Sequence, residues 1–229
     1  GYDGNFFSAL AIGDVDGDGK TEIVAGQGKE HTGAPGVSLI VFDGATLQEK
    51  WKSVDLGTYW GEVYDIKLAD VDGDGHTEII ASLSGSRLIV FDGVTHDLQL
   101  MVDHPARALE VSDIDGDSAL EILAGRTDGK IDIFDGLTFT IKKTVSTFDT
   151  TPINALRVVD LEGSGAVDWL VTRGNMLLIL DGQDQSLKWR SPDLSGNLGL
   201  YNHLVVKDTD GDGRSEIYLG SNLALYEFE

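Results

Sequence analysis

Short runs of apolar residues recur along the chain, and glycine and aspartate bound them. Runs such as residues 22–26 and 38–42 are rich in Val, Ile, Leu and Phe, which favour β-strands, and they are too short for typical helices. Asp-Gly pairs follow several of these runs, as at residues 43–44 and 92–93, and such pairs signal tight turns between antiparallel strands. The pattern predicts an all-β protein of short strands.

The same succession of segments occurs five times. An apolar strand precedes an aspartate-led loop, a second strand follows the loop, and third and fourth strands complete the first four units, whereas the fifth unit stops after its third strand at Glu229. The loops begin at Asp14, Asp70, Asp113, Asp160 and Asp208, with spacings of 56, 43, 47 and 48 residues. Four short strands per unit of this length are typical of β-propeller blades, which bury their faces only by stacking.

We therefore expect residues 1–229 to form a single all-β domain, a β-propeller with five blades of mostly four antiparallel strands. A closed five-blade ring with one three-stranded blade is favoured, and the alternative is that the chain is part of a larger propeller. Trp51, Trp169 and Trp189 are expected to pack between blades.

The charge limits the kinds of partner that the protein can have. The chain carries 39 acidic and 17 basic residues, a formal net charge of -22, which repels nucleic acid and anionic membranes. No apolar run approaches the ~18 residues of a membrane-spanning helix, so we expect no membrane insertion and any signal peptide to have been removed. The chain has no cysteine, which excludes disulfides and thiolate metal sites.

The repeated loops carry the chemistry that the sequence suggests. Their pattern, D-x-D-x-D-G-x-x-E, offers carboxylates at positions 1, 3, 5 and 9 and a backbone carbonyl at position 7, and such hard oxygen ligands suit Ca²⁺ better than Mg²⁺. The alternative is that Asp-Gly runs only make polar turns. The predicted ligands in repeats one, two and five, with the carbonyl at position 7, are Asp14, Asp16, Asp18, Lys20 and Glu22; Asp70, Asp72, Asp74, His76 and Glu78; and Asp208, Asp210, Asp212, Arg214 and Glu216.

Repeats three and four depart from the pattern. Repeat three has Ser118 where glycine is wanted, which costs ~1–2 kcal/mol if that position is left-handed. Its expected ligands are Asp113, Asp115, Asp117, the Ala119 carbonyl and Glu121. Repeat four is the weakest predicted site, with a metal-free turn as its alternative, and its ligands would be Asp160, Glu162, Ser164, the Ala166 carbonyl and Asp168. We expect four to five Ca²⁺ ions in all.

On these features the chain resembles the FG-GAP repeats of integrin-alpha-like calcium-binding propellers and related VCBS-type bacterial repeats. The shared elements are the aspartate loop, the blade-sized spacing and small residues after the second strand, as at Ala25-Gly26 and Ala124-Gly125. Gly33-Ala34-Pro35 is a trace of the Gly-Ala-Pro signature. The resemblance implies Ca²⁺ in hairpin loops opposite the usual ligand face. The better-known members have seven blades, so integrin partners are not carried over.

No catalytic residues are predicted. The chain has no G-x-S-x-G, H-E-x-x-H or P-loop motif, and its five histidines share no ligand spacing, so we interpret them as surface or loop residues. The hypothesis is a secreted or cell-surface bacterial module for binding, adhesion or structural support. The alternative is a polysaccharide-active lyase or glycosidase, which would need an acid pair; Glu30, Glu62 and Glu110 lie outside the loops, but no spacing links them.

The expected partner is a protein or a glycan bound on the face opposite the calcium loops, with a homo-oligomer or surface assembly as a further possibility. Aromatic side chains on glycine-rich loops stack on sugar rings or anchor proteins, although aromatics beside propeller strands more often pack between blades. The candidate ligand-binding residues are Tyr59, Trp60, His31 and Tyr201.

Overall fold

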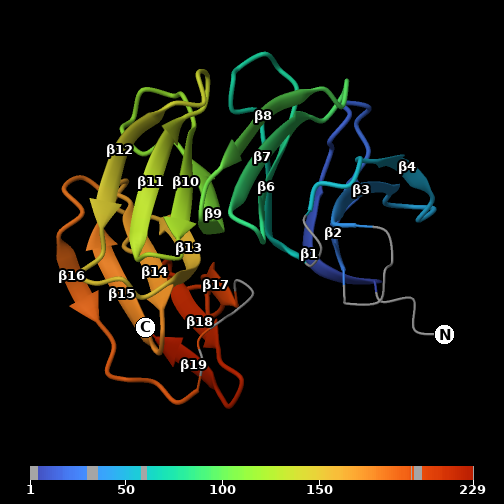
Figure 1. The fold of residues 1–229 in the computed structure, drawn as a ribbon. Coiled ribbons are helices and arrows are strands. Elements are labelled where there is room, and N and C mark those ends of the chain that lie inside the picture. The colour runs from blue at the N-terminus through green and yellow to red at the C-terminus, as the bar shows by residue number, and fades with distance from the viewer. Residues whose placement is uncertain (1–4, 30–35, 58–60, 197, 199–202, 229) are drawn as a thin grey trace. The chain divides into compact units, whose positions relative to one another are not determined.

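The computed structural model describes residues 5–29, 36–57, 61–196, 198 and 203–228, and these residues are all-β (Figure 1). They form five consecutive antiparallel sheets, four with four strands and one with three. The predicted five-blade β-propeller with a three-stranded last blade is confirmed, whereas closure of the blades into a ring stays a prediction. Among the described residues, no helix is long and apolar enough to cross a membrane.

Each sheet follows chain order, so neighbouring strands are joined by hairpins. Blade one comprises β1 (Asn5–Gly13), β2 (Glu22–Lys29), β3 (Ser38–Asp43) and β4 (Glu49–Lys52), and blade two comprises β5 (Val63–Ala69), β6 (Glu78–Leu83), β7 (Arg87–Asp92) and β8 (Leu98–Asp103). Blade three comprises β9 (Ala106–Ser112), β10 (Glu121–Arg126), β11 (Lys130–Asp135) and β12 (Ile141–Ser146). Blade four comprises β13 (Ile153–Val159), β14 (Asp168–Arg173), β15 (Met176–Asp181) and β16 (Leu187–Arg190), and blade five comprises β17 (Leu204–Lys207), β18 (Glu216–Gly220) and β19 (Leu225–Phe228).

The first hairpin of a blade holds the aspartate loop at its tip. In blade one, Gly13 pairs with Glu22 as the last residue pair before the loop, so position 9 of the loop is also the first residue of the second strand. The same pairing recurs between Ala69 and Glu78, and between Lys207 and Glu216. Strand pairing therefore sets where the last carboxylate of each of these loops lies.

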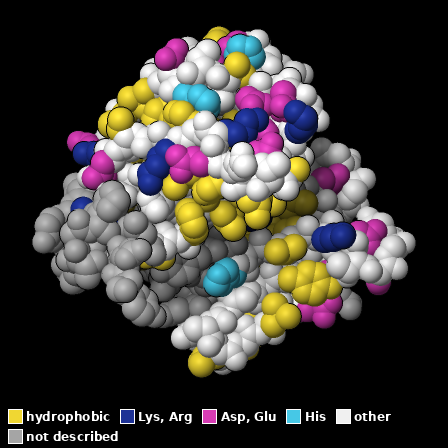
Figure 2. All heavy atoms as spheres, turned by 90° about the vertical axis from the view of Figure 1, so that its right-hand side faces the viewer, with side chains coloured by type: hydrophobic (Ala, Val, Ile, Leu, Met, Phe, Trp, Pro, Cys, Tyr) yellow, Lys and Arg dark blue, Asp and Glu magenta, His cyan; other side chains and the backbone are white. Residues whose placement is uncertain are grey.

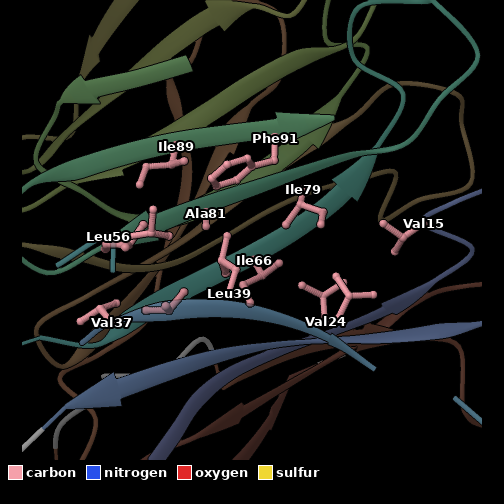
Figure 3. Packing of buried hydrophobic residues seen from close by; sticks show 13 residues of the cluster. Val15, Val24, Val37, Leu39, Leu56, Ile66, Ile79, Ala81, Ile89 and Phe91 are labelled. Atoms are coloured by element: carbon pink, nitrogen blue, oxygen red, sulfur yellow. The ribbon is translucent and has the colours of Figure 1, made fainter. Parts of the chain in front are cut away.

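The chain divides into two compact units, residues 1–109 with 137–139, and residues 110–136 with 140–229. In the first unit, apolar side chains from β2 and β3 face those of β5, β6 and β7 in one buried cluster (Figure 3). The members include Val24, Val37, Leu39, Ile66, Ile79, Ala81, Ile89 and Phe91. Full burial of such a side chain contributes roughly 1.5–3 kcal/mol, so contact between blades, and not the hairpins alone, stabilises this unit.

The second unit has a comparable core between blades four and five. Its fully buried members are Ala155, Leu170, Leu177, Leu198, Leu204 and Leu219. Trp189 contacts Phe228 of blade five with its ring edge, at 5.5 Å between centroids. In the first unit Trp51 stacks on His96 of blade two at 4.5 Å. Packing between blades is thus confirmed for Trp51 and Trp189, and Trp169 is fully buried.

The position of one histidine adds to the sequence interpretation. His104 lies in a connection between strands, in line with its interpretation as a surface or loop residue, but it is only 6% exposed. It lies in the connection between β8 and β9, where its backbone N–H donates to the Ser86 carbonyl at 2.7 Å. The burial of this loop residue is a tertiary property that no residue spacing reveals.

Packing explains why a small residue, Gly26, ends the apolar part of β2. A Cβ atom added at Gly26 would overlap the side chain of Val63 in the neighbouring β5. Because packed interiors do not absorb an extra methyl group without strain, only glycine allows this approach of the two blades.

We predict that Gly26→Ala lowers the free energy of unfolding by about 1–3 kcal/mol, because the new methyl group forces Val63 away. Chemical denaturation of the substituted and parent proteins measures the loss. In a Val63→Ala background the same substitution should cost clearly less, since the overlapping atoms are gone. An equal loss in both backgrounds would show that the contact does not set the identity of residue 26.

Candidate metal sites in the aspartate loops

The five loops are closed by the same side-chain to backbone hydrogen bond. The first aspartate of each loop accepts the backbone N–H of the residue at position 6. The N···O distances are 2.9 Å for Gly19 to Asp14, 3.0 Å for Gly75 to Asp70, 2.9 Å for Ser118 to Asp113, 2.6 Å for Gly165 to Asp160 and 3.1 Å for Gly213 to Asp208. The loop thereby coils around its first carboxylate, as the repeat pattern predicted.

Position 6 is left-handed throughout. Its φ is 81° at Gly19, 90° at Gly75, 84° at Gly165 and 89° at Gly213. Ser118 adopts a φ of 72° at the same position, so the strain expected for this serine is present. Repeat three still forms the same closing bond, so the surrounding structure overrides the local preference.

The glutamate at position 9 is buried and anchored by one oxygen. In repeats one, two, three and five its Oε2 accepts the backbone N–H of position 2 across the loop. These bonds are 3.1 Å to Glu22, 2.8 Å to Glu78, 3.2 Å to Glu121 and 2.8 Å to Glu216. The arrangement fixes the side chain and leaves the other carboxylate oxygen for a further partner.

Carboxylate oxygens converge at four of the loops. In each group, one ligand oxygen from every member lies within 4.8 Å of the others. Two oxygens on opposite sides of one Ca²⁺ are about 5 Å apart, so these groups could share an ion. The groups are Asp14, Asp16 and Asp18; Asp70, Asp72 and Glu78; Asp113, Asp115 and Glu121; and Asp208, Asp210, Asp212 and Glu216.

The structure does not bring every predicted ligand together. Among the described residues, no such group forms in repeat four, where Asp168 is shorter than glutamate and Ser164 replaces an aspartate. Asp74 instead groups with His76 and Asp92, whose Nδ1 and Oδ2 atoms are 3.4 Å apart. The sequence analysis missed this group because Asp92 belongs to a different turn of blade two.

Repeat two contains an uncompensated buried carboxylate. Glu78 is 0% exposed, and its Oε1 has no hydrogen-bond partner. Burial raises the pKa of Glu78 to about 7, and the nearby charges of Asp72, Asp74 and Asp70 act in the same direction. A buried carboxylate with an unpaired oxygen is unfavourable unless a cation or a proton neutralises it. The donor set therefore fits a bound divalent cation.

The other position-9 carboxylates in blades one, three and four have a lysine partner, which the sequence analysis did not identify. Lys50 lies 3.0 Å from Glu22, Lys142 lies 2.7 Å from Glu121, and Lys188 lies 2.9 Å from Asp168. Each lysine follows the aspartate of its Asp-Gly turn by seven residues, a spacing that could have revealed it. Figure 2 shows basic side chains lying beside acidic ones on one face of the molecule.

The candidate ligand-binding residues Tyr59, Trp60, His31 and Tyr201 lie outside the described residues, as does Glu30. Of the remaining acids considered for catalysis, Glu110 forms an ion pair with Arg157 at 3.3 Å. A salt bridge of this kind is an ordinary structural role for a half-buried carboxylate.

Comparison with known proteins supports the repeat assignment. Residues 14–81, which span the first two loops, match the family described as FG-GAP-like repeat. A comparison with curated protein sequences finds no match. Among solved structures, Saccharomyces cerevisiae Sqt1 is similar with a TM-score of 0.67 at 12% identity, over 98% of this chain and 59% of that one.

Two further structures share the fold. BBS1N, solved in complex with ARL6DN, has a TM-score of 0.59 at 9% identity over 96% of this chain and 78% of that one. The V. cholerae biofilm matrix protein Bap1 has a TM-score of 0.61 at 25% identity over 87% of this chain. The chain spans 30% of the length of Bap1, so it corresponds to one part of that protein.

We predict that Ser118→Gly raises the free energy of unfolding by about 1 kcal/mol, because glycine adopts a φ of 72° without strain. Denaturant unfolding of the two proteins in chelator measures the gain. Ser112→Gly, in strand β9, is the matched control and should destabilise the protein, since glycine weakens a strand. A loss of stability in both variants would contradict the assignment of strain to position 118.

Proposed function

Because residues 14–81 carry an FG-GAP-like repeat, we propose that this protein is an extracellular, calcium-stabilised β-propeller that acts as a non-catalytic module for binding, adhesion or structural support. The observation that carries the calcium part is the convergence of carboxylates at four hairpin tips, one of which contains the unpaired buried Oε1 of Glu78. Carboxylate and carbonyl oxygens are the ligands of Ca²⁺ in proteins.

In this proposal the loop residues at positions 1, 3, 5 and 9 and the carbonyl at position 7 hold the ions. Repeats one, two, three and five each take one Ca²⁺, and repeat four is the weakest site, so the count is four to five. Each ion offsets the mutual repulsion of carboxylates on one loop and so holds the first hairpin of its blade closed.

Several observations support an extracellular role. Calcium sites of extracellular modules have dissociation constants of about 10⁻⁴–10⁻³ M, and exposed loops of this kind suit that range. Of the three similar structures described above, the one with the highest sequence identity, 25%, is that of a biofilm matrix protein. A net charge of -22 argues against nucleic acid and anionic membranes as partners.

The partner in this proposal is a protein or a glycan, bound on the face opposite the aspartate loops, with self-association into a surface assembly as a further role. Connections between propeller strands tolerate sequence variation and carry binding residues on a rigid scaffold. The candidates for this surface remain His31, Tyr59, Trp60 and Tyr201, whose aromatic rings suit stacking on sugars.

We predict that removal of Ca²⁺ lowers the thermal unfolding midpoint by at least 5 °C. An ion at 100 times its dissociation constant contributes about 2.7 kcal/mol per site, and 1 kcal/mol corresponds to about 2–4 °C for a chain of this size. Calorimetry with Ca²⁺ and with chelator measures the difference, and native mass spectrometry counts the ions. Identical midpoints and no bound ion would refute the calcium proposal.

The two classes of loop supply an internal comparison. Asp72→Ala should remove more of the Ca²⁺-dependent rise in midpoint than Glu162→Ala, because Asp72 lies in a converging carboxylate group and Glu162 belongs to repeat four, where no such group is described. Comparing each variant with and without Ca²⁺ separates lost metal binding from other damage. Equal losses would show that the ranking of the two sites is wrong.

The binding role has its own test. We predict that the Ca²⁺-loaded protein binds at least one member of a panel of bacterial polysaccharides and surface proteins, and that Trp60→Ala weakens this binding at least tenfold, since stacked aromatics dominate such contacts. Leu137→Ala, which removes an apolar side chain that is 67% exposed in the turn between β11 and β12, at the end of blade three that carries its aspartate loop, is the control and should bind normally. No binding by the loaded protein would contradict the binding role, and native mass would then test self-association.

A further inference from the structure

The fourth strand of each four-stranded blade contains a β-bulge next to its aspartate loop. In blade one, Val41 pairs with Trp51 and Phe42 pairs with Glu49, so Lys50 is left without a partner in the ladder. The same skipped position is occupied by Lys142 in blade three and by Lys188 in blade four. In blade two it is occupied by Gln99. Bulges redirect a side chain, and here the redirected residue reaches the loop of its own blade.

In blades one and three the bulge lysine bonds two predicted metal ligands at once. Lys50 contacts Glu22 at 3.0 Å and also forms an ion pair with Asp16. Lys142 lies 2.7 Å from Glu121 and 3.2 Å from Asp115. An ammonium group held against two carboxylates supplies part of the positive charge that a divalent cation would otherwise supply.

Blade two lacks this charge. Gln99 donates through Nε2 to Asp72 at 3.1 Å, and the Oε1 atoms of Gln99 and Glu78 are both buried without hydrogen-bond partners. Glu78 is 0% exposed, so water does not replace the missing partner. In the described part of the chain, blade five has three strands and therefore no bulge residue of a fourth strand, and four carboxylates converge at its loop.

We propose that the bulge residue of the fourth strand sets the calcium affinity of its blade: Gln99 makes the loop of blade two a tight site, whereas Lys50 and Lys142 weaken the loops of blades one and three by competing for their carboxylates. This inference rests on the proposed calcium binding. It predicts an order of filling, with blade two occupied at lower Ca²⁺ concentration than blades one and three.

The same arrangement assigns different roles to the loops in the absence of metal. In blades one and three the lysine neutralises part of the negative charge of the loop. Its ammonium group therefore serves as the counter-charge of the hairpin whether or not Ca²⁺ is present. Blade two has no lysine at the bulge position, and the ion-pair contacts of His76 are with Asp74 and Asp92 rather than with Glu78. The buried Oε1 of Glu78 is left unpaired, so the first hairpin of blade two depends on the ion. Calcium sensitivity is thereby concentrated in one blade of the first unit.

The test is a Ca²⁺ titration of the ¹⁵N-labelled full chain, followed by NMR at the amides of Gly19, Gly75 and Ser118, each of which donates to the first aspartate of its loop. In the parent protein the Gly75 amide should reach its midpoint at about tenfold lower Ca²⁺ than the other two. Gln99→Lys should raise the Gly75 midpoint about tenfold, and Lys50→Gln should lower the Gly19 midpoint by a similar factor.

Lys52→Gln is the matched control. It makes the same change of charge on the same strand, but Lys52 bonds Gln27 at 2.9 Å and not a loop carboxylate, so the Gly19 midpoint should shift by less than twofold. The amide spectra report whether each variant is folded. If Gln99→Lys does not fold, the shift of the Gly19 midpoint in Lys50→Gln tests the proposal by itself.

The outcomes separate the two proposals. Calcium-dependent shifts with equal midpoints in all variants would overturn the inference and leave calcium binding intact. A Lys52→Gln effect as large as that of Lys50→Gln would also overturn it, because net charge and not the bulge would then set affinity. No calcium-dependent shift in any protein would overturn the calcium proposal together with the inference.

Discussion

The crowding of carboxylates at the tip of each first hairpin is the constraint on which the rest of the structure depends. Strand pairing brings the position-9 acid to the start of the second strand, where burial removes it from water, while the loop coils back through its first aspartate. Negative groups held this close repel one another unless backbone N–H groups, a lysine or a metal ion oppose them. All five loops use backbone N–H groups, and those of blades one, three and four also use a lysine. We propose that calcium is the third.

In every loop, backbone N–H groups offset part of the repulsion between the carboxylates. Glycine makes the backbone geometry for these hydrogen bonds possible. A left-handed residue at position 6 turns its N–H toward the first aspartate, as at Gly75. Repeat three achieves the same bond with a strained serine, which indicates that blade packing holds the loop in place. Loop and blade thus support each other, since the hairpin cannot open without disturbing the core beneath it.

The cores between neighbouring blades explain why the hairpins have fixed positions at all. Val24 and Leu39 of blade one are fully buried against blade two, and the close approach of Gly26 to Val63 sets the spacing of the two sheets. An isolated blade would expose these side chains to water. Placing the aspartate loops on such a stack gives them a rigid base, and the connections between strands are left free to vary, which suits a binding or scaffold module.

The sequence by itself determined the all-β class, the five units, the strands of each blade and the loops that carry the candidate ligands. It could do so because alternation, turn residues and spacing are local properties, and the loop carboxylates are four or fewer residues from their nearest partner in the pattern. It also identified Ser118 as the one substituted glycine of the loops and repeat four as the divergent copy.

Only the tertiary structure decided which charges meet. Lys50 and Glu22 are 28 residues apart, and a β-bulge in β4 brings their side chains together. The amino-acid composition of β4 does not show that this bulge forms. The structure likewise showed that the loops differ, because Gln99 leaves the buried oxygen of Glu78 unpaired while lysines satisfy its counterparts in blades one and three. The carboxylates can be read from the chain, but their neutralisation depends on contacts across the sheet.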